Sequence, residues 1–529
     1  MDPLSVAGLT IAVFDQLWKL GDRTAELVAN FRDFDNDSQS MEHKIKDENN
    51  RTRALQMLLF DSSSIYGGQC LFEQFDVDIQ EEIWVQLEQA SDVLDRAYRI
   101  LNRPSNTYLR VSPTPSHDSL ALGDTATRRP GSFQRFRWSL MDKKRVEAIL
   151  GVFSDSNDRI HENLKLWCLG TSIGVDLRHL RRLETDINSQ TLGFDTDARL
   201  QLATGQTSPT PQSLEIEELQ LRQELLKAKP LADSFSVLTW QGQNILAEYR
   251  SYAAESPVPV DIDNRTRDLV DRLANLLHQP KEALFCTPRC QGWVKQMQHN
   301  RIVYLFSIPE TAKPLPIRLL DALQSDKIPT PSLSQRFHLA SKLARCISQL
   351  QLVKWVHESF RSENIIFFRK NHSTSDQEDS IDFTEPWIFG FEFSRPESFF
   401  SNGVEDKCLG RNIYRHPDRQ LKPTQVFSKI HDIYALGVVL LEIGLWQPAT
   451  TLEKHGFANI RGPQSIKDKL IRQAEKRLGS KMGDKYKNIV LRCLDGKFDV
   501  VNDTKEDLKL QQAFRSKVVS VLQSAAENI

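Results

Sequence analysis

The spacing of apolar residues predicts long helices over residues 6–200. Leu9, Val13, Leu17 and Leu20 recur at intervals of three or four positions, which places them on one face of a helix. A second stripe of this kind contains Ile83, Leu87, Leu94, Tyr98 and Leu101, and a further helical run covers residues 145–169. Between these runs, residues 102–132 are rich in Pro, Ser, Thr and Gly, which is typical of a long, flexible, exposed loop. The pattern predicts an all-α helical bundle over residues 1–205.

The pattern changes after residue 205. The segment GQTSPTPQS interrupts every periodicity, and a charged, helix-prone stretch follows it, so residues 206–229 are predicted to form a linker and a brace helix. Short β-prone runs come next at 235–238, 244–250 and 302–308, with a helical run at 265–277 and long helices from residue 334 onward. Strands first and helices later predict an α+β domain over residues 230–529, with a small sheet lobe and a larger helical lobe.

Composition sets the class of protein. With 529 residues the chain is long enough for two or three domains, since one domain typically holds about 100 to 200 residues. Its 68 Lys and Arg residues nearly balance 70 Asp and Glu residues, so no overall field attracts nucleic acid, and none is expected as a partner. Seven scattered cysteines without disulfide-framework spacing indicate a reducing compartment, and no secretory signal is expected at the N-terminus, so we expect a cytoplasmic protein.

One segment of the second domain carries the strongest motif. Residues 357–367, HESFRSENIIF, resemble the catalytic loop of protein kinases, whose pattern H-R-D-L-x-x-x-N places a base and a magnesium ligand on one turn. His357 and Asn364 match the pattern, whereas Ser359 stands where the aspartate is expected and Arg361 follows in the same loop. The predicted chemistry of the domain depends on these positions.

Five further fragments stand in kinase order around this loop. Residues 245–250 resemble the V-A-I-K strand with Arg250 at the lysine position, and residues 305–309 resemble the strand that enters the hinge between the lobes. Downstream stand GFEFSR from Gly390, YRHPD with Pro417, and DIYALGVVLLE with Asp432 and Gly437, which resemble the D-F-G segment, the A-P-E segment and the buried helix after it. Six fragments in this order imply a two-lobed protein-kinase-like fold.

The same positions imply loss of phosphoryl transfer. Ser359 is a poor base at neutral pH, and Gly390, although followed by the matching Phe391, has no carboxylate to hold magnesium, so only Asn364 remains of the metal ligands. Arg250 is no conservative replacement for lysine, and residues 230–243 contain a single glycine, Gly242, in place of a glycine-rich loop. We therefore expect an inactive, pseudokinase-type domain without cofactor; an unconventional active kinase is the alternative.

Several matching residues have a structural interpretation. In this fold, residues in the positions of His357, Pro417, Asp432 and Gly437 hold the loops and helices together, so their presence indicates the fold and not activity. A metal site is not expected: Cys286 and Cys290 are four positions apart, but no second Cys or His pair follows at zinc spacing.

The start of the chain resembles the fungal HeLo domain, also called the prion-inhibition and propagation domain. The resemblance rests on MDPLSVAGL at residues 1–9, FDQLW at 14–18, and RFRW at 135–138 with the helix after it, and it covers residues 1–205. Members of that family execute cell death in heterokaryon incompatibility by releasing an N-terminal segment into membrane. The resemblance implies that residues 4–20 are the inserting segment.

The residues that this interpretation brings to a membrane are both apolar and basic. They are Leu4, Leu9, Val13, Leu17, Trp18, Arg135, Arg137, Lys143 and Lys144. Asp15 and Lys19 oppose a spanning helix, because a charge near the bilayer centre costs about 3 kcal/mol. Two simpler interpretations stay open: residues 4–20 are a first core helix that never leaves the bundle, and the basic residues are a solvated helix start.

The combined expectation is a kinase-like switch that restrains or frees a helical effector. A regulatory protein partner is expected, and activation would bring self-association and contact with membrane lipid. The alternatives are a scaffold that does not lyse membranes and a divergent protein kinase.

Overall fold

The computed structural model of the chain describes residues 3–30, 36–102, 143–204, 213–252, 258–369, 381–391, 395–396, 408–420, 423–453, 457, 462–504 and 506–529. The chain divides into two compact units, Met1–Asp195 and Thr196–Ile529, and the division falls inside helix α8, Phe194–Thr204. The loop predicted at 102–132 and the linker predicted at 205–213 lie outside the described residues, apart from Asn102 and Ser213.

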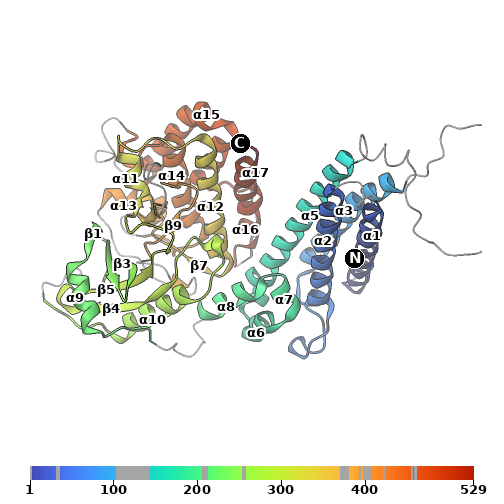
Figure 1. Cartoon of the computed structure of the whole chain (residues 1–529), viewed down its shortest axis with the longest axis horizontal. Coiled ribbons are helices and arrows are strands. Elements are labelled where there is room, and N and C mark those ends of the chain that lie inside the picture. The colour runs from blue at the N-terminus through green and yellow to red at the C-terminus, as the bar shows by residue number, and fades with distance from the viewer. Residues whose placement is uncertain are drawn as a thin grey trace, which may run out of the picture. The chain divides into compact units, whose positions relative to one another are not determined.

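Helices make up most of the described part of the first unit (Figure 1). Its helices are α1 Pro3–Ala29, α2 Asn36–Phe60, α3 Val77–Leu101, α5 Lys143–Gly170, α6 Leu177–Thr185 and α7 Ile187–Thr191. Helix α1 packs against α2 and α3, and α3 packs against α5. The prediction of a helical first region is confirmed.

The apolar stripe of α1 belongs to the core of this unit. Val6, Phe14 and Leu17 are at most 1% exposed, and the Phe14 ring meets the edge of Phe60 from α2 at 6.1 Å between centroids. Gly21 allows the two helices to approach, because a β-carbon there would lie 2.3 Å from Oδ1 of Asn49. The Asn49 amide donates to the carbonyl of Trp18 on α1 at 3.0 Å. Among the described helices, none is both long and apolar enough to cross a bilayer.

The second unit begins with an antiparallel sheet in the order β1-β2-β3-β5-β4. Its strands are β1 Lys229–Ala232, β2 Phe235–Trp240, β3 Gln243–Ser251, β4 Cys290–Gln296 and β5 Arg301–Ser307, with α10 Asn264–His278 between β3 and β4. The β-prone runs at 235–238, 244–250 and 302–308 and the helical run at 265–277 are confirmed. Helix α9, Leu219–Lys227, packs on β2.

The segment before α9 joins this sheet instead of extending the helix. Ile216 donates its backbone N–H to the Trp293 carbonyl at 2.8 Å, and Trp293 of β4 donates to Leu214 at 3.0 Å. Gly292 permits the approach, because a β-carbon there would meet the Leu214 carbonyl at 2.6 Å. The helical part of the predicted brace is therefore α9 alone within the described residues.

Helices dominate the rest of the second unit (Figure 1). They are α11 Leu319–Gln324, α12 Leu333–Leu352, α13 Leu409–Asn412, α14 Lys429–Leu445, α15 Pro463–Asp495, α16 Leu508–Phe514 and α17 Ser520–Asn528. Short strands β6 Ile317–Arg318, β8 Ile365–Phe367 and β9 Trp387–Ile388 form a second sheet, and β7 Trp355–Val356 pairs with β10 Arg395–Pro396. The sheet β1–β5 lies at one end of the unit, and α12, α14 and α15 lie at the other, so the coarse α+β prediction is confirmed.

Helix α14 is the centre of this helical region. Nearly every residue from Lys429 to Leu445 is buried, and α12 and α15 pack against it. A helix buried on all sides is apolar all round, as the run IYALGVVLLEIGL shows. Its two glycines allow close packing: a β-carbon on Gly437 would meet Cβ of Cys493 at 2.8 Å, and one on Gly444 would meet Leu478 at 2.5 Å.

Candidate functional site

The loop 357–364 lies directly above the start of α14 and is held there by Asp432. The Oδ2 atom of Asp432 accepts the backbone N–H of His357 at 2.8 Å, and Oδ1 accepts that of Glu358 at 3.0 Å. Glu358 has a left-handed backbone with φ +61°, a conformation that costs energy for a residue with a β-carbon. The buried carboxylate thus fixes a strained turn at the start of the loop.

His357 ties this loop to the segment before Gly390. Its ring is fully buried; Nδ1 accepts the backbone N–H of Ser359 at 3.3 Å, and Nε2 lies 2.9 Å from the Phe389 carbonyl. Because Nδ1 accepts, the ring proton is on Nε2 and donates to Phe389. Burial lowers the pKa of His357 to about 3, so the imidazole is neutral at physiological pH. Both facts agree with the structural role that the sequence predicts.

The hydroxyl of Ser359 is occupied by its own loop. Its Oγ accepts from Nη1 of Arg361 at 2.8 Å and from the Asn364 amide nitrogen at 3.3 Å. The same amide nitrogen donates to the Ser359 carbonyl at 2.7 Å. The position that resembles that of the kinase base in sequence therefore carries neither a carboxylate nor an unoccupied hydroxyl.

Gly390 cannot be exchanged for a residue with a side chain without rearrangement. Its φ is +84°, and a β-carbon would lie 1.9 Å from the Asn364 amide nitrogen. The amide of Asn364 thus fills the space next to Gly390. Phe391 is buried beside His357, with 5.0 Å between the ring centroids. The remaining residues of the predicted GFEFSR motif, apart from Arg395, lie outside the described part of the chain.

Arg250 lies in the sheet, on strand β3 opposite Ile302 of β5. Burial raises the pKa of the neighbouring Tyr304 phenol, and the positive charge of Arg250 works against that rise. Pro417 lies at the first position of a short 3-10 helix, Pro417–Arg419, whose N-cap is His416. The structure therefore brings His357, Ser359, Arg361, Asn364, Gly390 and Asp432 together and leaves Arg250 in the sheet.

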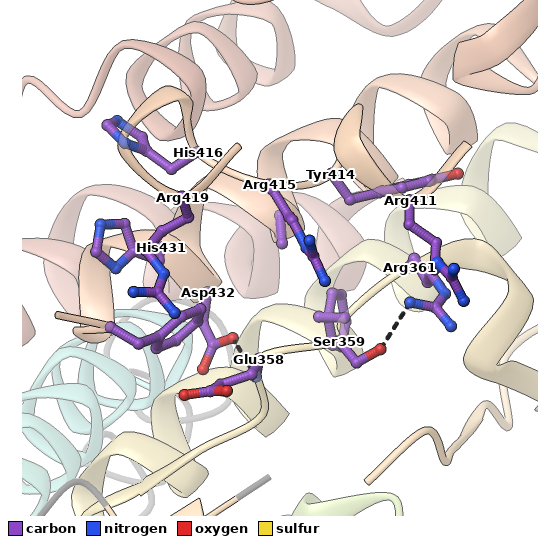
Figure 2. Close-up of a pocket in the computed structure, with 13 residues that line it drawn as sticks. Glu358, Ser359, Arg361, Arg411, Tyr414, Arg415, His416, Arg419, His431 and Asp432 are labelled. Atoms are coloured by element: carbon purple, nitrogen blue, oxygen red, sulfur yellow. Dashed lines mark hydrogen bonds between the residues drawn. The ribbon is translucent and has the colours of Figure 1, made fainter. Parts of the chain in front are cut away.

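A pocket opens beside this loop, between residues 358–361, 411–419 and the first turn of α14 (Figure 2). Four arginines line it, Arg361, Arg411, Arg415 and Arg419, against two carboxylates, Glu358 and Asp432. Its volume is about 20 Å³, which suits one water molecule or the tip of a larger ligand. The excess of positive charge favours an anion there.

Within the described residues, one set of three groups lies close enough to be tested as a metal site. Ligand atoms of His416, Asp418 and His431 are within 4.8 Å of one another. However, the Nδ1 atom of His431 accepts the backbone N–H of Ser428 at 2.9 Å, so its proton is on Nε2. A metal on Nε2 would require removal of that proton. A histidine that binds a metal normally donates a hydrogen bond from its other ring nitrogen, whereas Nδ1 of His431 accepts one. The set fits a metal ion poorly.

The buried carboxyl group of Glu442 is linked through Tyr414 to Ser362 in the loop 357–364. Its Oε1 accepts from the Tyr414 hydroxyl and from the backbone N–H of Ala449, both at 2.7 Å. The Tyr414 hydroxyl also lies 2.8 Å from Oγ of Ser362. Burial raises the pKa of Glu442 to about 7, against the hydrogen bonds from Ala449 and Tyr414 that lower it.

This raised pKa predicts a pH-dependent stability. Folded Glu442 keeps its proton up to about pH 7, while an unfolded glutamate loses it near 4.5, so the unfolded state binds fewer protons in between. The free energy of unfolding should therefore fall by about 3 kcal/mol as pH rises through this window. Glu442→Gln should remove that fall. Denaturant unfolding of both proteins at several pH values tests this, because the histidine contributions cancel in the difference; parallel pH profiles would contradict it.

The candidate membrane residues of the first unit differ in exposure. Leu17 is fully buried, Val13 and Trp18 are half-buried, and Leu9 is 43% exposed. Lys144 is exposed, and Lys143 pairs with Asp37. The side chain of Leu4, and Arg135 and Arg137, lie outside the described residues. Release of α1 would therefore expose side chains that now lie in the core, in addition to Leu9, which is already at the surface.

Sequence reasoning singled out Arg361 but missed Arg411, Arg415 and Arg419 of the pocket and the buried Glu442. Arg411, Arg415 and Arg419 recur every fourth residue, and this was the available signal. The spacing alone does not distinguish them from a solvated basic face, because only the fold brings Arg361 and His431 next to them.

Comparison with known proteins gives one family match. Residues 309–529 match the family model of a domain of unknown function, DUF7580. The match covers the loop, the pocket and α14, and it begins after the sheet β1–β5. No curated protein matches the chain.

Proposed function

We propose that the second unit is a protein-kinase-like module that does not transfer phosphate and acts as a switch on the helical unit. The observation that carries the proposal is the contact at Gly390. Kinases hold magnesium with an aspartate and an asparagine at the positions that Gly390 and Asn364 resemble. Here the asparagine amide fills the space in which a side chain at 390 would start, at 1.9 Å from its β-carbon.

The order of elements supports the kinase-like part of the proposal. A five-stranded antiparallel sheet with α10 between β3 and β4 is followed by α12, the loop 357–364 and the buried helix α14. Asp432 of α14 and His357 of the loop make the hydrogen bonds to backbone that the motif resemblance implies. These contacts preserve the shape of the loop, with Ser359 in place of a carboxylate at the position that resembles that of the kinase base.

The test of this part is the response of the full chain to nucleotide. A ligand held only by the native state raises its melting temperature, so Mg²⁺ with ATP should leave the transition of the second unit unchanged. A saturable rise would show that the protein binds nucleotide. The variant Arg250→Ala then locates the binding: a rise that persists in it comes from elsewhere on the protein, and one that disappears restores the divergent-kinase alternative.

For the first unit we propose a membrane-active effector, triggered by a regulatory protein partner and active at cytoplasmic membranes as an oligomer. Support comes from α1, whose exposed residues include Leu9 and Ile11, at 43% and 37%, next to a fully buried stripe. Such a helix binds a bilayer interface once it leaves its bundle, because its apolar face is then available.

A pair of core variants tests the effector role. Phe14→Ala weakens the packing of α1, whereas Phe153→Ala removes the same side chain from α5; their rings are 0% and 2% exposed. If α1 is the inserting segment, Phe14→Ala should increase leakage from phosphatidylserine vesicles more than Phe153→Ala at equal loss of stability. Equal leakage from both would reflect general unfolding and contradict the role of α1.

The burial of α1 also favours a second candidate, a scaffold that does not lyse membranes. Phe14 and Leu17 are fully buried and Gly21 packs on Asn49, as in a permanent core helix. In that case neither variant should cause leakage, with or without a partner.

A further inference from the structure

Four arginines and two carboxylates line the pocket beside residues 358–361, and Arg361 also pairs with the carboxylate of Glu363 at 2.9 Å. Arg361 and Arg419 are 8% and 7% exposed, so their charges are recessed and not on a solvated surface. Of the two lining carboxylates, Asp432 already accepts two backbone N–H groups. Charges in such a recessed place are screened less by water and salt than charges at the surface.

An independent observation is the side chain of His431, which lines the pocket and is 2% exposed. Its Nδ1 accepts from the Ser428 backbone, and its Nε2 has no hydrogen-bond partner among the described residues. Burial first, and then the charges of His416 and Arg419, lower the pKa of His431 to about 3, so the ring is neutral with its proton on Nε2. A buried N–H donor without a partner is unfavourable, and an acceptor in the pocket would offset that cost.

The chemistry of the ligand follows from these donors. Guanidinium groups bind oxyanions through two parallel hydrogen bonds. Phosphate and carboxylate are the two anions whose geometry matches these donors best. Figure 2 shows Arg361, Arg411 and Arg415 around Ser359, and Arg419 next to His431 at the other end of the pocket. With donors at both ends, a group with three acceptor oxygens fits better than a planar carboxylate with two.

The size and walls of the pocket restrict what carries this group. A recess of about 20 Å³ admits only the end of a ligand, so the rest of the ligand must lie outside it. Phe360, Phe427 and Ala435 add apolar surface to the walls. A phosphorylated side chain projects from a narrow, extended segment and reaches such a recess. The phosphate of a lipid headgroup is part of a bilayer surface, which is too broad to enter it.

We propose that the pocket between residues 358–361, 411–419 and the start of α14 binds the phosphate group of a phosphorylated protein segment. This inference rests on the lining groups alone and holds whether or not the second unit acts on the helical unit. It goes beyond the proposed function because it names the signal that the module reads.

The test uses the full chain and a minimal probe, N-acetyl-O-phosphoserine methylamide, with inorganic phosphate and the unphosphorylated amide as comparisons. At constant ionic strength, the phosphoserine probe should raise the melting temperature of the second unit saturably, and its ³¹P resonance should broaden. Inorganic phosphate should bind at least tenfold more weakly, because it lacks contacts with the apolar walls, and the unphosphorylated amide should have no effect.

Variants connect the response to the pocket. Arg415→Gln should weaken binding of the probe at least tenfold, since a hydrogen bond to a charged group is worth about 1.5 to 3 kcal/mol. Arg472→Gln changes an exposed arginine of α15 outside the pocket and should bind as the wild type does. Arg415→Lys keeps the charge but loses the planar fork, and it should fall between the two. Melting curves without probe establish that each variant is folded.

Three outcomes would overturn the proposal. One is the absence of any response to the phosphoserine probe in the folded wild type. Another is inorganic phosphate binding as tightly as the probe, which would make the ligand a free ion. The third is binding to vesicles of phosphatidylcholine and phosphatidic acid that Arg415→Gln abolishes, without a response to phosphoserine, which would assign the pocket to lipid.

Discussion

Replacing Gly390 with aspartate is expected to destabilise the second unit by about 3 to 5 kcal/mol and to produce no phosphoryl transfer. Two costs add. A residue with a β-carbon is strained at φ +84°, and its β-carbon would overlap the Asn364 amide, 1.9 Å away. The substitution supplies the magnesium-binding residue that the motif lacks, yet the surrounding structure has no space for it. Denaturant unfolding of the second unit and a phosphorylation assay measure the two parts of the expectation.

Gly242 provides the matched control for this variant. It has a similar φ of +75°, but nothing lies within 4 Å of its would-be β-carbon. Gly242→Asp should therefore show the backbone cost alone, about 1 kcal/mol. If overlap with the amide is the larger part, Asn364→Ala combined with Gly390→Asp should recover stability relative to Gly390→Asp. A Gly390→Asp protein that is as stable as the wild type and binds Mg²⁺ would contradict the account of the site.

Removing the carboxylate of Asp432 is expected to cost about 3 to 5 kcal/mol. In Asp432→Ala, the backbone N–H groups of His357 and Glu358 lose their acceptor at 2.8 and 3.0 Å in a buried place. The left-handed turn at Glu358 would then lose the contact that fixes it. Besides unfolding experiments, hydrogen exchange at these two amides should accelerate far more than exchange in the sheet β1–β5.

An exposed aspartate on α15 is the control. Asp484 has an 80% exposed side chain and pairs only with Lys487 among the interactions of the described residues. Asp484→Ala should cost less than about 0.5 kcal/mol, because exposed ion pairs contribute little. If Asp432→Ala were equally mild, the carboxylate would not be what holds the loop, and the scaffold role drawn from the motif would be wrong.

Local periodicity was sufficient for most elements. The helices of the first unit and the strands β2, β3 and β5 follow apolar patterns that neighbouring residues set. Strand β4, Cys290–Gln296, escaped notice because its sequence, CQGWVKQ, has polar residues and a glycine. That glycine allows the close approach of the segment with Leu214, a contact between residues far apart in sequence, and it has a φ of +152°.

The candidate site divides in the same way. Three of its residues could be located from the order of the motifs, since His357, Asn364 and Asp432 are recognisable by type and spacing. What those residues do depends on distances that no spacing contains. Ser359 is bonded within its own loop, and Asn364 fills the space beside Gly390.

The sequence by itself thus determined the helical and α+β regions and the residue types at the positions that resemble kinase motifs. Periodicity and residue type are local properties, so they are legible along the chain. Only the tertiary structure decided that α1 is a core helix in this conformation, that Glu442 is buried with a raised pKa, and that four arginines and the buried His431 line one pocket. Each of these arises from burial and charge contributed by segments distant in sequence, which a linear pattern does not contain.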